Sequence, residues 1–228
     1  MSVSLRCYST SLGCPKNRVD TERLLGSLGV ALVPVESPDE AELVFINTCA
    51  FIQPATEESV RTIAQAIADI EELPKRPLLA VAGCLVGRYH AEDLAPELPE
   101  VDLWLDNSDL EAWPAMLARK LGLPEPTVPG RILSTGPSYA WLKISDGCRH
   151  ACSFCAIPNI RGGHRSHCKD MIVREARALL DQGVKELNLV AQDLTEWGCD
   201  LDGKQDLRTL LDGLLPLPGL ERLRLMYL

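Results

Sequence analysis

The first part of the chain alternates short, wholly apolar runs with stretches of helical spacing. The apolar runs, which we interpret as strands, lie at 5–9, 43–46, 78–82 and 101–105. Apolar residues recur at helical spacing over 17–28 and 54–70, and helix-like sequence resumes from Tyr89. Strands that are apolar on both faces and alternate with helices are typical of a parallel sheet covered on both sides. The pattern therefore predicts an α/β fold.

The last third of the chain shows the same alternation. A strand is predicted at 139–145, a helix from Asp170 to about 180, a strand at 186–191, a helix at 206–215 and a third strand at 223–227. A loop rich in cysteine separates the first of these strands from the first helix.

Between these two parts lies a stretch with too many helix and strand breakers for either element. The breakers are Pro124, Pro126, Pro129, Gly130, Gly136 and Pro137. We therefore predict an N-terminal α/β domain at 1–122, a linker at 123–137 and a second domain at 138–228.

Composition places the chain among soluble globular proteins. Of its 228 residues, 46% are hydrophobic and 24% charged, and the length suits one large domain or two small ones. No leader opens the chain, and no apolar run approaches the roughly 18 residues of a membrane span. We therefore expect a cytoplasmic protein that does not bind a membrane.

The charge is uneven along the chain. Residues 1–130 carry 10 basic and 20 acidic side chains, whereas residues 131–228 carry 13 and 12. An acidic first domain is repelled by bare nucleic acid, so no stable nucleic-acid complex is expected and a basic protein partner suits it better. A surface that is acidic only for solubility explains the same numbers equally well.

Nine cysteines are unusual for a cytoplasmic chain, where thiols stay reduced and more often bind metals or catalyse reactions. Cys148, Cys152 and Cys155 form a C-x-x-x-C-x-x-C cluster on one loop. Soft sulfur ligands select zinc, copper(I) or iron–sulfur clusters. Three cysteines are one short of a structural zinc site, but they suit an iron–sulfur cluster with one iron open to an outside ligand. Zinc stays possible if His150 or His164 supplies a fourth ligand.

Three further cysteines are distributed along the first domain. Cys14, Cys49 and Cys84 each follow a predicted strand. Parallel strands bring their carboxyl ends to one edge of a sheet, where such sheets bind ligands, so these thiols are expected to meet. A lone cysteine is commonly a small buried hydrophobe, but three at equivalent positions indicate a site.

The loop cluster, with Phe154 before its last cysteine and a strand upstream, resembles the signature of radical S-adenosylmethionine enzymes. Together with the three single cysteines, it resembles the methylthiotransferase family, in the branch that modifies a ribosomal protein. The sequence motifs on which this resemblance rests are Ser11-Leu12-Gly13-Cys14-Pro15-Lys16-Asn17, Asn47-Thr48-Cys49, Gly83-Cys84, Ser145-Asp146-Gly147-Cys148, Cys155-Ala156-Ile157-Pro158 and Ala191-Gln192-Asp193. The tRNA-modifying branch more often has Gln-Met-Asn after its first cysteine and Gly-Gln-Asn at the later strand end, and neither is present.

The resemblance implies an enzyme, a transferase, that adds sulfur and a methyl group to the β-carbon of an aspartate in the twelfth protein of the small ribosomal subunit. It implies two 4Fe-4S clusters, S-adenosylmethionine and an external electron donor. By this resemblance the two triads, Cys14, Cys49, Cys84 and Cys148, Cys152, Cys155, hold the clusters. Phe154 and Gln192 are candidate contacts to S-adenosylmethionine, although packing and strand capping would explain them as well. No catalytic residue is identified.

The resemblance also implies that the second domain is the first part of a βα barrel. A complete barrel takes about 250 residues, so we expect the barrel to be truncated and this chain alone to be inactive. Cys7, Cys168 and Cys199 fit no ligand position, and we interpret them as packing or surface thiols. His167-Cys168 after Ser166, and Gly87, depart from the family pattern. A tRNA adenosine methylthiotransferase and a non-enzymatic zinc or iron–sulfur module remain the alternatives.

Overall fold

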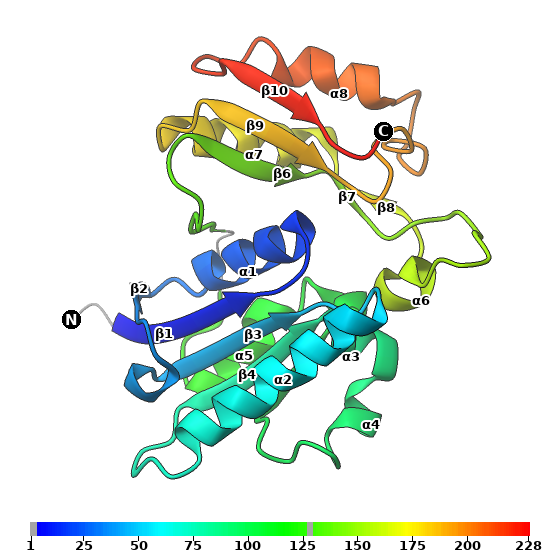
Figure 1. Cartoon of the computed structure of the whole chain (residues 1–228). Coiled ribbons are helices and arrows are strands. Elements are labelled where there is room, and N and C mark those ends of the chain that lie inside the picture. The colour runs from blue at the N-terminus through cyan, green and yellow to red at the C-terminus, as the bar shows by residue number, and fades with distance from the viewer. Residues whose placement is uncertain (1–3, 127–129) are drawn as a thin grey trace. The chain divides into compact units, whose positions relative to one another are not determined.

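The computed structural model describes residues 4–126 and 130–228. The chain divides into two compact units, Met1–Ile132 and Leu133–Leu228. The division falls within 123–137, and residues 127–129 of that predicted linker lie outside the described part. Figure 1 shows the elements of both units.

The first unit is built on a five-stranded sheet in the order β2-β1-β3-β4-β5. Its strands are β1 (Ser4–Ser11), β2 (Ala31–Pro34), β3 (Leu43–Thr48), β4 (Leu78–Gly83) and β5 (Leu103–Asp106). Every pairing is parallel. All six residues of the central β3 are buried, which explains why that strand reads as a continuous apolar run. The predicted α/β fold with a parallel sheet is confirmed.

Helices cover both faces of this sheet. They are α1 (Pro15–Ser27), α2 (Gln53–Ile70), α3 (Cys84–Tyr89), α4 (Ala91–Leu94) and α5 (Trp113–Leu121), with short 3-10 turns at Pro38–Glu40 and Asn107–Asp109. Leu24 of α1 and Trp113 and Leu117 of α5 pack into one core with the strands. The amphipathic α2 buries Ile63, Ala66 and Ile70.

The structure differs from the sequence prediction at four places in this unit. Strand β2 and helix α5 were not predicted, since their apolar stretches are short or interrupted. Helical sequence was expected from Tyr89, and α4 does begin at Ala91, but a separate helix, α3, precedes it from Cys84. His90, with a φ of 59°, interrupts the helical conformation between the two. Residues Gly130 to Ile132 do not form an open linker: the buried Arg131 guanidinium lies 2.7 Å from the Glu22 carboxylate on α1.

The second unit has a three-stranded parallel sheet in the order β10-β9-β6. Its strands are β6 (Tyr139–Lys143), β9 (Glu186–Val190) and β10 (Arg222–Leu225), with helices α6 (Ile157–Arg161), α7 (Lys169–Asp181) and α8 (Leu207–Leu214). The strand predicted at 139–145 is split, because Ser145 and Asp146 leave β6 and form β7 (Ser145–Asp146), which pairs antiparallel with β8 (Arg165–Ser166).

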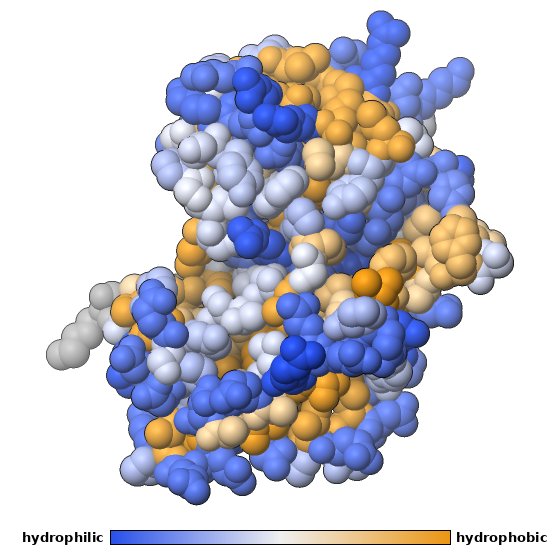
Figure 2. Space-filling view, in the orientation of Figure 1, coloured by the Kyte–Doolittle hydropathy of each residue, from blue (hydrophilic) through white to orange (hydrophobic). Residues whose placement is uncertain are grey.

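One hydrophobic core joins the sheet of the second unit to α7 and α8. Ile172 and Leu179 of α7 and Leu210 and Leu214 of α8 pack against the buried strand residues. On the face drawn in Figure 2, apolar surface gathers over β10 and α8. Leu215, directly after α8, is exposed. Of the helices in residues 4–126 and 130–228, none combines the length and the apolar character that crossing a membrane requires.

Candidate metal centres

The register of the first sheet aligns the strand ends that precede three cysteines. Ser11 of β1 pairs with Asn47 of β3, and Asn47 pairs with Ala82 of β4. Each cysteine lies two or three residues beyond one of these aligned positions. Cys14 is the N-cap of α1, Cys49 follows β3 and Cys84 begins α3. Parallel pairing therefore places all three at one edge of the sheet.

The thiols of this edge interact with one another. A hydrogen bond between Cys49 and Cys84 raises the pKa of Cys49, burial raises it further, and both Cys84 and Cys14 add to the rise through their charges. Cys49 and Cys84 are buried and Cys14 is partly exposed. Cys49 therefore needs a nearby cation before it can be a thiolate, and metal binding supplies one.

Two glycines make room at this edge. A β-carbon on Gly13 would lie 2.5 Å from Cβ of Cys49, and one on Gly83 would lie 2.2 Å from Oδ1 of Asn47. Both glycines have positive φ, 82° and 98°. Any side chain here would be strained and would push into the loops that carry the cysteines.

Amide side chains hold the cysteine loops in place. Asn17 is fully buried, and its Nδ2 donates to the carbonyls of Leu12 at 2.9 Å and Thr48 at 2.8 Å. Asn107, at the end of β5, donates from Nδ2 to Sγ of Cys84 at 3.7 Å. Such hydrogen bonds orient ligands around a metal site. The sequence analysis did not identify Asn107. Its position directly after a strand of the same sheet could have indicated a role, because the three cysteines also follow strands of that sheet.

The second triad lies on the loop between β7 and α6. Cys152 is exposed, and Cys148 and Cys155 are partly exposed. The amide of Cys155 donates to the carbonyl of Cys152 at 3.1 Å, and the amide of Cys148 to the carbonyl of Gly162 at 3.2 Å. The three thiols are thus carried on one accessible loop whose two ends meet.

A buried ionic group fastens the base of this loop. Oδ1 of Asp146 lies 2.8 Å from the Arg161 guanidinium, and Oδ2 lies 2.6 Å from Nζ of Lys143. Burial alone would raise the pKa of Asp146, but Lys143, Arg161 and His167 hold it well below its ordinary value. Asp146 precedes the first cysteine of the loop and Arg161 follows the last, so their ion pair closes the loop.

The thiols of each triad are spread more widely than the ligands of a single metal ion. Among the described residues, neither triad has its three sulfur atoms all within 4.8 Å of one another. A cubane cluster places each cysteine on a different iron, so its ligands are spread more widely than those of one zinc ion. Three thiols at each site are the donor type that iron–sulfur clusters take, so the residues fit clusters by their chemistry.

The two histidines considered as a fourth zinc ligand lie in other groups. Nε2 of His150 is 3.2 Å from Oδ2 of Asp193 and 3.9 Å from Oε1 of Glu196. His164 is grouped with Cys199 and Asp200. Sequence reasoning missed these carboxylates, because nothing in local spacing joins the loop after β9 to either histidine.

The remaining candidate residues are placed as follows. The side chain of Phe154 is 88% exposed, so it does not pack beneath the cysteine loop. Gln192 is partly buried, just beyond the end of β9. Cys7 is a buried residue of β1, whereas Cys168 and Cys199 are exposed.

Comparison with known proteins places this chain among relatives along nearly all of its length. A model of an uncharacterized protein family, UPF0004, matches residues 6–106. The chain is 69% identical over 221 residues, 97% of its length, to the ribosomal protein uS12 methylthiotransferase RimO of Nitratidesulfovibrio vulgaris (strain DP4), and covers 51% of that protein. It is 59% identical over 228 residues to the protein of the same name from Lawsonia intracellularis, covering 52% of it. The chain thus spans about half the length of the curated relatives it matches.

Solved structures share the fold at low sequence identity. The radical S-adenosylmethionine methyltransferase TsrM of Kitasatospora setae matches with a TM-score of 0.54 at 12% identity, over 86% of this chain and 50% of that one. The cobalamin-dependent S-adenosylmethionine radical enzyme OxsB matches with a TM-score of 0.55 at 13% identity, over 94% of this chain and 37% of that one. These likenesses concern the fold alone. The sequence relatives are far closer, and the chain is similar to these uS12 methylthiotransferases along nearly all of its own length.

Proposed function

We propose that this chain carries the two iron–sulfur sites of a radical S-adenosylmethionine methylthiotransferase that acts on an aspartate of ribosomal protein uS12. The observation that carries the proposal is the presence of two cysteine triads, one in each unit. The close relatives are named as uS12 methylthiotransferases. Because the chain spans about half of their length, the reaction is proposed for the whole protein and not for this chain alone.

The first site is held by Cys14, Cys49 and Cys84. Parallel strands bring their loops together, Gly13 and Gly83 keep the edge free of side chains, and Asn107 orients Cys84. Burial of Cys49 and Cys84 keeps water from two of the three ligands. Three cysteines can bind a cubane cluster and leave one iron free for a further ligand.

The second site is held by Cys148, Cys152 and Cys155 on the loop that the Asp146–Arg161 pair closes. S-adenosylmethionine, when bound at such a site, supplies radical chemistry for a C–H bond that no side-chain base could deprotonate at a useful rate. The exposed ring of Phe154 is free to stack on a ligand, and Gln192 offers an amide at the strand end. These two residues are proposed to contact S-adenosylmethionine.

The proposed reaction also implies the partners of the protein. The substrate is the small-subunit ribosomal protein, and an external donor supplies electrons. The acidic balance of residues 1–130 suits a basic protein substrate better than bare RNA. The proposed location is the cytoplasm, with no membrane and no stable nucleic-acid complex.

The test begins with metal content. The chain is reconstituted anaerobically with iron and sulfide, and bound iron and sulfide are counted after desalting. Two cubane clusters per chain are expected, and Cys84→Ala or Cys152→Ala should each lose one cluster and keep the other. Cys7→Ala, which removes a buried thiol of β1 in the same unit as Cys84, is the matched control and should lose no iron. Zinc in place of iron, or equal iron in all variants, would refute the ligand assignment.

Activity is then measured with S-adenosylmethionine, a reductant and purified uS12. The Nitratidesulfovibrio vulgaris relative is the comparator of greater length, and it should release 5′-deoxyadenosine and give uS12 the mass increase of one methylthio group. A chimera that carries residues 1–228 of this chain on the remainder of that relative should do the same. The change Cys152→Ala in the chimera should abolish 5′-deoxyadenosine release. Modification of a tRNA adenosine instead of uS12 would overturn the substrate assignment while leaving the cluster sites intact.

A further inference from the structure

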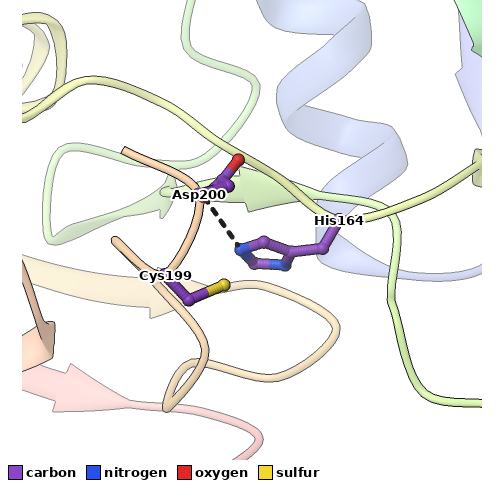
Figure 3. A group of neighbouring side chains, drawn as sticks. All are labelled: His164, Cys199 and Asp200. Carbon is purple, nitrogen blue, oxygen red and sulfur yellow. Dashed lines mark ion pairs between the residues drawn. The ribbon is translucent and has the colours of Figure 1, made fainter. Parts of the chain in front are cut away.

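A further group of side chains of metal-binding types lies in the second unit and shares no residue with either cysteine triad. It consists of His164, just before β8, and Cys199 and Asp200, on the loop between β9 and α8 (Figure 3). One nitrogen, one sulfur and one oxygen of these residues all lie within 4.8 Å of one another. Two segments about 35 positions apart in the sequence are therefore brought together at this point.

The histidine is held in a fixed place. Its side chain is 3% exposed, and its Nε2 lies 3.6 Å from Oδ1 of Asp200. The same nitrogen lies 3.0 Å from Oγ of Ser166. In Figure 3 the sulfur of Cys199 is turned toward the imidazole ring. An ordered ring with a thiol and a carboxylate at its edge needs little rearrangement to bind an ion.

Neighbouring groups orient the carboxylate. The backbone amide of Ser166 donates to Oδ2 of Asp200 at 2.8 Å, which leaves Oδ1 facing His164. The amide of Gly198 donates to Oγ of Ser166 at 2.9 Å and fixes that hydroxyl. Hydrogen bonds from surrounding groups that orient the ligands are a regular feature of protein metal sites.

We propose that His164, Cys199 and Asp200 form a binding site for a zinc-type divalent cation. Imidazole, thiolate and carboxylate are the three ligand types that zinc takes in proteins. A thiolate and a carboxylate together balance the charge of one divalent ion. Three protein ligands leave a fourth tetrahedral position, which the exposure of Cys199 opens to water or to an added ligand.

The local charges favour a cation. Burial raises the pKa of Cys199, and the carboxylates of Asp200 and Glu196 raise it further, against the opposing effect of Arg149. The same negative charges that disfavour a thiolate attract a metal ion. Binding would release the thiol proton to solvent, with no change of oxidation state.

The site would fasten the loop between β9 and α8 to the segment at β8. That segment is a two-stranded ribbon with few hydrogen bonds of its own, since β7 and β8 are two residues long each. A metal bridging His164 to Cys199 and Asp200 would stabilise this connection by binding only the folded form.

The test follows the reactivity of one thiol, so it is independent of enzyme activity. The chain, reconstituted with iron and sulfide so that the triads are filled, is treated with iodoacetamide with and without one equivalent of zinc alone. Modification of each cysteine is followed by peptide mass spectrometry. Zinc should slow the alkylation of Cys199 by about ten-fold or more, because a zinc-bound thiolate is shielded, and a chelator should restore the rate.

Two controls sharpen the result. Cys168 is also exposed in the second unit but lies outside the group, so zinc should not change its rate. His164→Gln and Asp200→Asn keep side-chain size and should each remove the protection of Cys199. Equal rates at Cys199 with and without zinc in the unaltered chain would overturn the proposal. Protection that persists in both variants would overturn it as well, and the far-ultraviolet circular dichroism spectrum reports whether a variant is still folded.

Discussion

Gly13 faces the side chain of Cys49 so closely that a β-carbon on Gly13 would lie 2.5 Å from Cβ and 2.7 Å from Sγ of that cysteine. Two loops that follow different strands of the first sheet therefore touch where Cys14 and Cys49 project. The absence of a side chain at position 13 permits this contact.

Gly13→Ala is expected to displace Cys49 and to remove the cluster of the first unit. The added carbon has no room, and φ is 82°, where an alanine is strained by roughly 1–2 kcal/mol. Iron per chain after anaerobic reconstitution should fall by half. Gly29→Ala is the matched control, because Gly29 has a φ of 68° and nothing within 4 Å of its added carbon. Similar iron loss in both variants would show that backbone strain, and not the contact with Cys49, matters.

Asn17→Ala should destabilise the first unit by about 2–4 kcal/mol, because the buried carbonyl of Thr48 and the partly buried carbonyl of Leu12 lose their donor. The measurement is hydrogen exchange of the amides in β1, β3 and β4 as a function of urea. Gln65→Ala removes an exposed amide of α2 that donates to Asp69, and it should change stability by no more than about 0.5 kcal/mol. A loss of stability in the Asn17 variant as small as that of the control would contradict the role given to Asn17.

Asp146→Asn should destabilise the second unit by about 3–5 kcal/mol, because Lys143 and Arg161 would lose the buried carboxylate that they share. Hydrogen exchange at β6 and β9 measures the effect. Arg222→Gln, which removes an exposed guanidinium from Glu186, should have a much smaller effect, since solvent screens that pair. Unchanged exchange in the Asp146 variant would mean that the buried ionic group does not hold the cysteine loop.

The cap of α8 should give the second unit a weak acid sensitivity. Backbone and hydroxyl hydrogen bonds from Thr209 lower the pKa of Asp206. A carboxyl with a lowered folded pKa contributes stability above its unfolded pKa and loses that contribution as pH falls through the folded pKa.

The melting temperature is measured as a function of pH for the unaltered chain and for the Asp206→Asn variant. Asparagine can still cap the helix but carries no charge. The two curves should differ above the ordinary carboxyl range and converge as the pH falls below it. Curves that stay parallel throughout would show that the charge of Asp206 plays no part.

Much of this protein follows from the sequence by itself. The alternation of apolar runs with amphipathic stretches specifies parallel strands joined by helices, because a strand buried on both faces must be apolar throughout. Cys14, Cys49 and Cys84 can be expected to meet for the same reason, since parallel strands end at one edge. The spacing of Cys148, Cys152 and Cys155 needs no tertiary information either, as one loop carries them.

Only the tertiary structure decided which other groups surround these cysteines. Asn107 reaches Cys84, Arg161 reaches Asp146, and His164 meets Cys199 through contacts between segments that no local period connects. The interruption of the helix at His90 likewise depends on a single backbone angle. The periodicity of the sequence indicates which residues face the core. Contacts between residues far apart in the sequence depend on strand register and on the paths of the loops, and both are determined only when the chain packs.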